Sequence, residues 1–242
     1  MLIKQGGAGG GSADIADAPK ITFDGKWSGW HIEFYDEEAY WEALLQTSGT
    51  LSVSGQYTAD AWGIGGGGAS GQYYRSGYVY KTGGGSGYTN MATDMALSGG
   101  VAVTIGAGAT TQRSLGNTER EGGQGGTTSF LSLSCSGGNG GRGDSQSGGA
   151  GGSNGAGSGN GGENGSPGAG KIMSKFWSVE HNTEYGKGGN AMSSTGGGGG
   201  GYLEVGKSDG PEGHGFGAGG GSVDGYTGFQ GNAGCLVIRI KA

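Results

Sequence analysis

The 242-residue sequence is poor in cysteine, proline and charge, and it contains no long apolar run. Two cysteines cannot form a disulfide framework, and no segment approaches the roughly 20 apolar residues of a transmembrane helix. With only 3 prolines and no persistent Gly-X-Y register, a collagen triple helix is excluded. The formal net charge of −6 does not suit phosphate backbones or anionic membranes. We therefore expect neither nucleic acid nor a membrane as a partner.

Glycine is by far the most frequent residue in the sequence. There are 67 glycines, and with the 3 prolines they make 70 of the 242 residues. Such a fraction is typical of a disordered chain. The aromatic content of 9% is that of a folded protein, and with only 14% charged residues charge repulsion would not keep the chain open. We therefore expect a folded chain, with disorder as the alternative.

Composition divides the chain into three parts. Residues 1–18 are small and glycine-rich and are interpreted as a linker or attachment arm. Residues 19–64 hold four of the five tryptophans and predict a small β-rich subdomain, and residues 65–242 form a glycine-rich domain. The first residues lack the apolar stretch of a secretory signal, so we expect synthesis and folding in a cytoplasm.

Alternation of apolar and polar residues with period two predicts strands. The predicted strands are His31–Tyr35, 49–55, 57–62, 101–105, 130–136 and 236–240. The residues after Asp36 are compatible with a hairpin, which we favour, or with a short helix over 39–45. Cys135 and Cys235 lie in apolar strand-like contexts, which favours two buried free thiols over a disulfide.

The long glycine tracts have a period of three. Gly137, Gly140 and Gly143 recur at this spacing, and the pattern returns within 149–168. Three residues per turn is the period of the polyproline II helix, and glycine lets such helices approach backbone to backbone. The sequence therefore predicts an all-β fold with a polyglycine II helix bundle and little or no α-helix. The interrupting segment 171–187 is expected to form a loop at one end of the bundle.

An ordered set of short motifs resembles the glycine-rich domain found near the ends of many bacteriophage tail proteins. The matching stretches are Ser48–Val53, Ala61–Gly68, Val101–Gly108, Gly126–Phe130, Gly215–Gly221 and Gly234–Ile240. The glycine tracts also resemble tail-tip adhesins in which polyglycine II helices are stacked and their loops bind the host.

This resemblance implies a function. It implies a virion tail protein made in the host cytoplasm, with a distal module that recognises a bacterial surface protein or glycan. Other tail proteins would bind through the N-terminal region, and a homotrimer is left open. A purely structural tail component and an ice-binding glycine-helix protein are the alternatives.

Motifs for catalysis and metal binding are weak. Arg142-Gly143-Asp144 matches the tripeptide that integrins recognise, but such a match occurs easily by chance in a glycine-rich chain. His181 and Glu184 lack a second histidine nearby. The acidic residues of 33–42, including Glu42, are interpreted as surface carboxylates of a solvated turn rather than as a catalytic pair. We expect no enzyme activity, no cofactor and no metal.

Aromatic clusters between glycine runs indicate binding sites more specifically than these motifs indicate catalysis or metal binding. Tyrosine, tryptophan and arginine are enriched at binding hot spots, because they offer large contact area at low entropic cost. Packing of these side chains on glycine helices is the alternative interpretation at each position. The candidate receptor-binding residues are Tyr73, Tyr74, Arg75, Tyr78, Phe176, Trp177, His181 and Tyr185.

Overall fold

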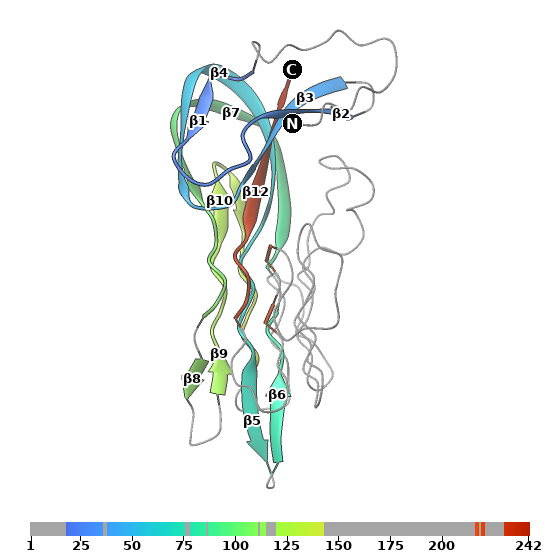
Figure 1. Ribbon diagram of the computed structural model, residues 1–242, viewed down its shortest axis with the longest axis vertical. Coiled ribbons are helices and arrows are strands. Elements are labelled where there is room, and N and C mark those ends of the chain that lie inside the picture. The colour runs from blue at the N-terminus through green and yellow to red at the C-terminus, as the bar shows by residue number, and fades with distance from the viewer. Residues whose placement is uncertain are drawn as a thin grey trace.

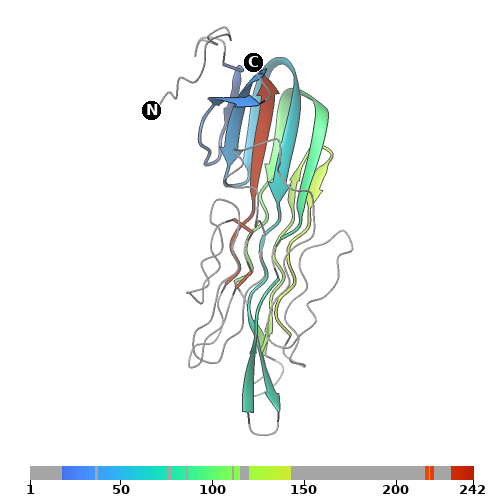
Figure 2. The same cartoon turned by 90° about the vertical axis from the view of Figure 1, so that its right-hand side faces the viewer.

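The computed structural model describes residues 18–35, 38–75, 78–85, 87–110, 112–114, 120–142, 216–217, 219–220 and 230–242. These residues form an elongated molecule with a β-sheet at each end and extended glycine-rich chain between them (Figures 1 and 2). No helix occurs among them, which confirms the all-β expectation for this part of the chain. The period-three tract 149–168 and the predicted loop 171–187 lie outside the described residues.

One end, which we call the head, is an eight-stranded antiparallel sheet. Its order is β11-β10-β7-β4-β12-β3-β2, and β1 pairs with β4 off this path. The strands are β1 (Ile21–Phe23), β2 (His31–Tyr35), β3 (Glu38–Leu45), β4 (Gly49–Ile64), β7 (Thr89–Thr104), β10 (Thr128–Phe130), β11 (Leu133–Cys135) and β12 (Cys235–Lys241). The strands of 19–64 therefore pair with strands from the glycine-rich part of the sequence.

The head sheet is bent along β4 and β7, which are 16 residues each. Their register shifts between Val53 and Gln56 and again between Ala59 and Ala61. Gly55 lies at the first shift with a φ of 113°, which a side chain rarely adopts. The sequence pattern was interpreted as two strands separated at this glycine. That interpretation is wrong, because the glycine forms a bulge that bends one continuous strand.

Bending encloses the main hydrophobic core between the two halves of the sheet. The most deeply buried side chains include Leu45, Leu51, Leu97, Phe130 and Ile238. They come from five different strands that alternate inward and outward residues. A second cluster on the other face of β3, β4 and β12 contains Leu44, Trp62, Ile64, Cys235 and Val237, with Phe216 packed against it.

Two local predictions have different outcomes. The favoured hairpin is confirmed, because β2 and β3 pair antiparallel and residues 39–45 are strand rather than helix. The single strand predicted over 130–136 is wrong. β10 and β11 form a hairpin with its turn at Leu131 and Ser132, and Leu131 has a φ of 48° and is 45% exposed. An apolar residue in the alternating pattern was thus a turn residue.

Seven glycine-rich segments run beside one another below the head and are joined by backbone hydrogen bonds (Figure 2). Most continue directly from a head strand: β4 runs into 65–70, and β12 follows 230–234. We call them the glycine segments. They are 65–70, 83–88 without Ser86, 105–110, 122–127, 136–142, 217–220 without Ala218, and 230–234.

Segment 65–70 lies at the centre, and its N–H groups follow a period of three. Gly65 and Gly68 both donate to segment 83–88, and Gly66 and Ala69 both donate to 122–127, at 2.8–3.1 Å. Gly67 donates to Asn232. The carbonyl groups of this segment accept bonds from segments 105–110, 136–142 and 217–220. Six neighbours therefore surround one buried segment.

The six neighbours are also bonded to one another in a closed ring. In order around the centre they are 83–88, 136–142, 122–127, 105–110, 230–234 and 217–220. Chain direction alternates at each step, so every bond around the ring is antiparallel. Such a ring provides partners for backbone groups that have no side chains to shield them.

Close packing leaves no room for a Cβ atom at most of these glycines. A Cβ on Gly66 would overlap the carbonyl oxygen of Ala107, and one on Gly140 would overlap the carbonyl oxygen of Gly122. Buried Thr128 joins head and glycine segments: its hydroxyl donates to the Ile64 carbonyl at 2.7 Å and accepts from the Gly106 N–H at 2.9 Å.

Candidate functional site

Four of the predicted receptor-binding residues lie at the end of the molecule opposite the head (Figure 1). Tyr73, Tyr74 and Arg75 belong to β5 (Gly71–Arg75), and Tyr78 begins β6 (Tyr78–Thr82). The two strands pair as a hairpin, in which Tyr73 is opposite Tyr80 and Arg75 is opposite Tyr78. This aromatic cluster between glycine runs therefore has the backbone of a paired ribbon.

A second hairpin completes this end. β8 (Gln112–Ser114) pairs with β9 (Arg120–Gly122), and Arg120 is opposite Gln72 of β5. The order of the resulting sheet is β6-β5-β9-β8. We call these four strands the distal sheet.

The glycine segments position the distal sheet. Segment 65–70 leads into β5, and the chain returns from β6 through 83–88, so the first hairpin is held at both of its ends. Segments 105–110 and 122–127 hold the second hairpin in the same way. Segment 136–142 also reaches this end, where the Thr82 hydroxyl donates to the Arg142 carbonyl at 2.9 Å. Rigid extended chain thus carries this sheet away from the head.

The other predicted binding residues, Phe176, Trp177, His181 and Tyr185, lie outside the described residues. Phe216, another aromatic residue of the last glycine-rich stretch, packs against the second cluster of the head, which contains Trp62. This contact fits a role in packing.

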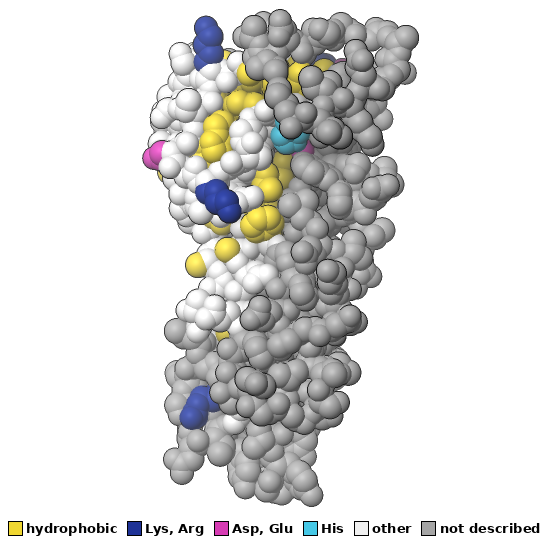
Figure 3. Space-filling model, in the orientation of Figure 1, with side chains coloured by type: hydrophobic (Ala, Val, Ile, Leu, Met, Phe, Trp, Pro, Cys, Tyr) yellow, Lys and Arg dark blue, Asp and Glu magenta, His cyan; other side chains and the backbone are white. Residues whose placement is uncertain are grey.

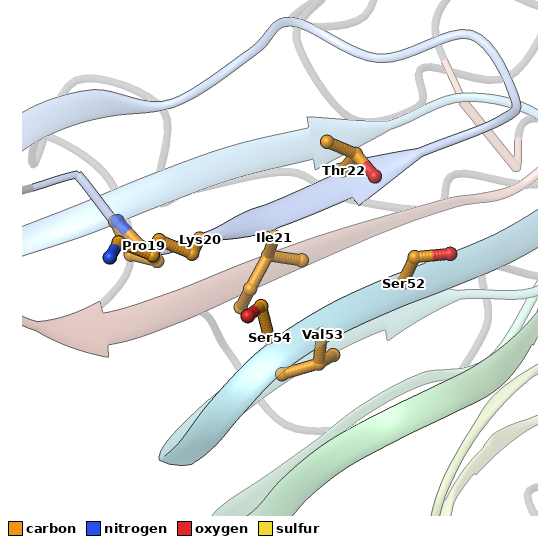
Figure 4. Close-up of a pocket in the computed structure, with 7 residues that line it drawn as sticks. All are labelled: Pro19, Lys20, Ile21, Thr22, Ser52, Val53 and Ser54. Carbon is orange, nitrogen blue, oxygen red and sulfur yellow. The ribbon is translucent and has the colours of Figure 1, made fainter.

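A shallow hollow of about 490 Å³ opens on the head between β1 and β4 (Figure 4). It is lined by Pro19, Lys20, Ile21, Thr22, Ser52, Val53 and Ser54. Lys20 is its only ionisable lining residue. No acid–base pair is present in this lining, so the hollow lacks the convergent titratable groups of a hydrolytic site.

Three charged residues of the head are register neighbours on adjacent strands. Arg239 on β12 is opposite Glu42 on β3 and Asp60 on β4, and its guanidinium lies 3.1 Å from the Asp60 carboxylate. The same guanidinium lies 4.2 Å from the centre of the Tyr40 ring. Glu42 is fully buried, so its assignment to a solvated turn is wrong. Its register partner Arg239 is buried as well, so this acidic residue belongs to the interior of the sheet region.

An exposed polar group follows these residues toward the C-terminus. Lys241 contacts Glu38 at 2.5 Å, and the Tyr40 hydroxyl donates to the same carboxylate at 2.5 Å. The hydrogen bond from Lys241 lowers the pKa of Glu38, and the bond to Glu38 raises the pKa values of Tyr40 and Lys241. These contacts stabilise the charged carboxylate and pin β12 to β3.

Both cysteines are free and buried, as the sequence predicted. Burial raises the pKa of the Cys135 thiol to about 12 and that of Cys235 well above its usual range. A thiol that stays protonated at neutral pH is a poor nucleophile and a poor metal ligand. These residues therefore act as small apolar side chains.

Within the described parts of the chain, no group of three or more histidine, cysteine or carboxylate side chains is placed to hold a metal ion. The same residues contain no helix that could span a membrane. Searches of protein-family models and of curated proteins found no match to the sequence.

Proposed function

We propose that the glycine segments are polyglycine II helices packed in a hexagonal bundle. The support is the period of three in the bonds of Gly65–Ala69 together with six neighbours around one segment. A helix with three residues per turn directs successive peptide groups 120° apart, which matches three acceptor segments for consecutive N–H groups.

Hydrogen exchange tests this proposal. In a closed bundle, the amides of Gly66, Gly67 and Gly68 exchange only when the bundle opens, as slowly as those of β12 in the head. Gln124, which is exposed on an outer segment, is the comparison within the bundle. Exchange of the central glycines at the rate of an unstructured peptide would contradict the bundle.

We further propose that the protein is a bacteriophage tail component whose distal sheet binds the bacterial surface. The observation that carries this is the separation of the two ends. Ala18 packs against the main core of the head, and the Ala242 N–H donates to the Ala39 carbonyl of β3. Two hairpins are displayed at the far end of the glycine segments (Figure 1). The motif order of phage tail glycine-rich domains supports the same assignment.

This division fits the physics of the two regions. Glycine segments offer mainly backbone, so their sides have few side chains with which to discriminate a receptor. Residues held on hairpins beyond a rigid scaffold can vary without disturbing the contacts that stabilise the fold. Attachment to the rest of the tail is then a property of the head and of the residues that precede it.

The test is adsorption of the purified protein to a panel of bacterial cells. Tyr74→Ala, Arg75→Ala and Tyr78→Ala combined should abolish binding and leave the thermal unfolding temperature nearly unchanged. Thr22→Ala with Lys26→Ala, both exposed in the head, is the control and should keep adsorption.

Two outcomes would overturn the proposal. One is unchanged adsorption by the distal variant. The other is a distal variant that unfolds while its folded fraction still binds, which would make these residues structural. Incorporation into tails without binding to any cell would favour the purely structural component. The same expectation of lost binding applies to Phe176→Ala and Trp177→Ala.

A further inference from the structure

Basic residues are concentrated at the distal end of an acidic protein. The described strands of the distal sheet, with residues 139–142 beside them, carry five basic residues and one acidic residue, a local net charge of 5 − 1 = +4 against −6 for the whole chain. Four of the five arginines of the sequence are in this group. The residues are Arg75, Lys81, Arg113, Arg120 and Arg142, with Glu121 as the acid.

Strand pairing places these residues at the same end of the molecule. Arg120 is the register partner of Gln72 on one side and of Ser114 on the other, so it lies on an inner strand of the sheet. Arg113 is opposite Glu121. The Arg142 backbone is bonded to Thr82 at the end of β6. Lys81 and Arg120 are the register partners of Gln72 on its two sides, about 10 Å apart, which is close to the Debye length of about 8 Å at physiological salt. Arg75 is three residues farther along β5.

The charge at this end is therefore shared by strands that are distant in sequence. On the face drawn in Figure 3, a patch in the colour of lysine and arginine lies near the lower end. Arg142 is exposed, and Arg120 is partly exposed. The formal charge of the whole chain conceals this concentration. Of the 20 carboxylates, six, including Asp24, Glu38 and Asp94, lie in the described head, and 13 lie outside the described residues.

We propose that the distal sheet binds an anionic polysaccharide, one that carries carboxylate or phosphate groups along its length. This inference rests on the proposed function and names the class of receptor. The guanidinium group is a planar fork that matches both anions with paired hydrogen bonds. Tyr73, Tyr74, Tyr78 and Tyr80 belong to the same hairpin as Arg75, and tyrosine offers a rigid ring and a hydroxyl for contact with sugars.

The charge difference between the two ends adds orientation. The described head has six acidic and four basic residues, a net charge of 4 − 6 = −2, against +4 for the distal group. A polyanion is therefore attracted mainly to the distal end, and this attraction weakens when salt screens the charges.

Binding of the full chain to defined polymers tests the inference. The probes are alginate for carboxylates, a poly(glycerol phosphate) for phosphates and dextran as a neutral polysaccharide, each titrated at several salt concentrations. We expect binding to one or both charged polymers, no binding to dextran, and an affinity that falls as salt increases. The two charged probes distinguish the source of the anion.

Matched variants locate the site. Arg75→Gln with Arg142→Gln should weaken binding about tenfold, since two charge pairs are lost. Arg75→Lys with Arg142→Lys should recover part of the affinity, which a loss caused by misfolding would not allow. Lys20→Gln with Lys26→Gln removes the same charge from the head and should change affinity less than twofold.

Three results would overturn the inference: equal binding to dextran, equal losses for the head and distal variants, or equally tight binding to a DNA duplex, which would reveal unselective attraction of polyanions. Cell adsorption separates this inference from the proposed function. Adsorption without binding to either charged polymer would refute the polysaccharide and leave the adhesin role standing. Polymer binding without adsorption to any cell would refute the adhesin role.

Discussion

The head and the glycine segments stabilise the same chain by different means. In the head, apolar side chains such as Leu97 and Ile238 are buried between the halves of a bent sheet, and their removal from water supplies the stabilising free energy. In the glycine segments, side chains are almost absent, and backbone groups bond to neighbouring backbone on every side of 65–70.

The two regions therefore differ in what they tolerate. A core of side chains can rearrange in part when one side chain becomes smaller. A backbone packed against backbone cannot move aside for an added methyl group without breaking several bonds at once. Glycine also loses more conformational entropy on folding than other residues, so the bonds between segments must be complete to offset this cost.

The largest effect is expected for Gly66→Val. The added side chain would overlap Ala107, and it would disrupt the bonds of Gly66 with Gly126 and Gly138, both 2.9 Å long. Each buried backbone N–H or C=O group left without a hydrogen-bond partner costs about 1–3 kcal/mol. We therefore expect the free energy of unfolding to fall by about 5 kcal/mol. Chemical denaturation measures this change.

Ala107→Val is the matched control, because Ala107 lies in a neighbouring glycine segment but its side chain is exposed. It should change the free energy of unfolding by less than about 0.5 kcal/mol. Similar losses for Gly66→Val and Ala107→Val would contradict the close packing. Gly140→Val, on an outer segment, should also destabilise strongly, as should Gly152→Val if 149–168 packs in the same way.

Leu97→Ala is expected to have a smaller effect. Leu97 is 1% exposed in the main core, and truncating such a side chain costs about 2–5 kcal/mol through lost burial and a cavity. Leu131→Ala, at the exposed turn between β10 and β11, provides the control with the same chemical change and should be nearly neutral. A Leu97→Ala protein as stable as Leu131→Ala would show that the head does not depend on this core.

The smallest effect concerns alkaline pH. Burial raises the pKa of Cys135 to about 12 from an ordinary value near 9, so between these values the unfolded state loses a proton that the folded state keeps. Stability contributed by the protonated thiol is therefore lost as pH rises above about 9, by up to about 1.4 kcal/mol per pH unit.

Denaturation at pH 8, 9 and 10 measures this slope, and Cys135→Ala supplies the comparison. The variant should show a shallower decline than the wild type, although tyrosines and lysines titrate in both. Identical slopes would mean that Cys135 is not protected by burial in the folded protein.

The sequence alone determined the class of structure and the free state of the thiols. Alternation with period two located the strands around His31, Val101 and Leu236, because a half-buried strand needs apolar residues on one face only. This alternation gave the wrong strand boundaries at two positions, because it does not distinguish a bulge or a turn from a regular strand residue. Gly55 is a bulge within one strand, and Leu131 is a turn residue. Glu42 was missed because its partner Arg239 is 197 positions away in the sequence.

Tertiary structure alone decided which segments meet. Period three marks glycine segments that are able to pack, but every such segment presents nearly the same backbone, so the pattern does not select its neighbours. The head makes part of that selection, because segments that continue paired strands, such as 122–127 and 136–142 beside β10 and β11, are bonded to each other. The ring adds bonds between segments whose strands are not neighbours in the head, such as 230–234 with 105–110. The same arrangement brings Arg113, Arg120 and Arg142 to one end, which their separate places in the sequence do not reveal.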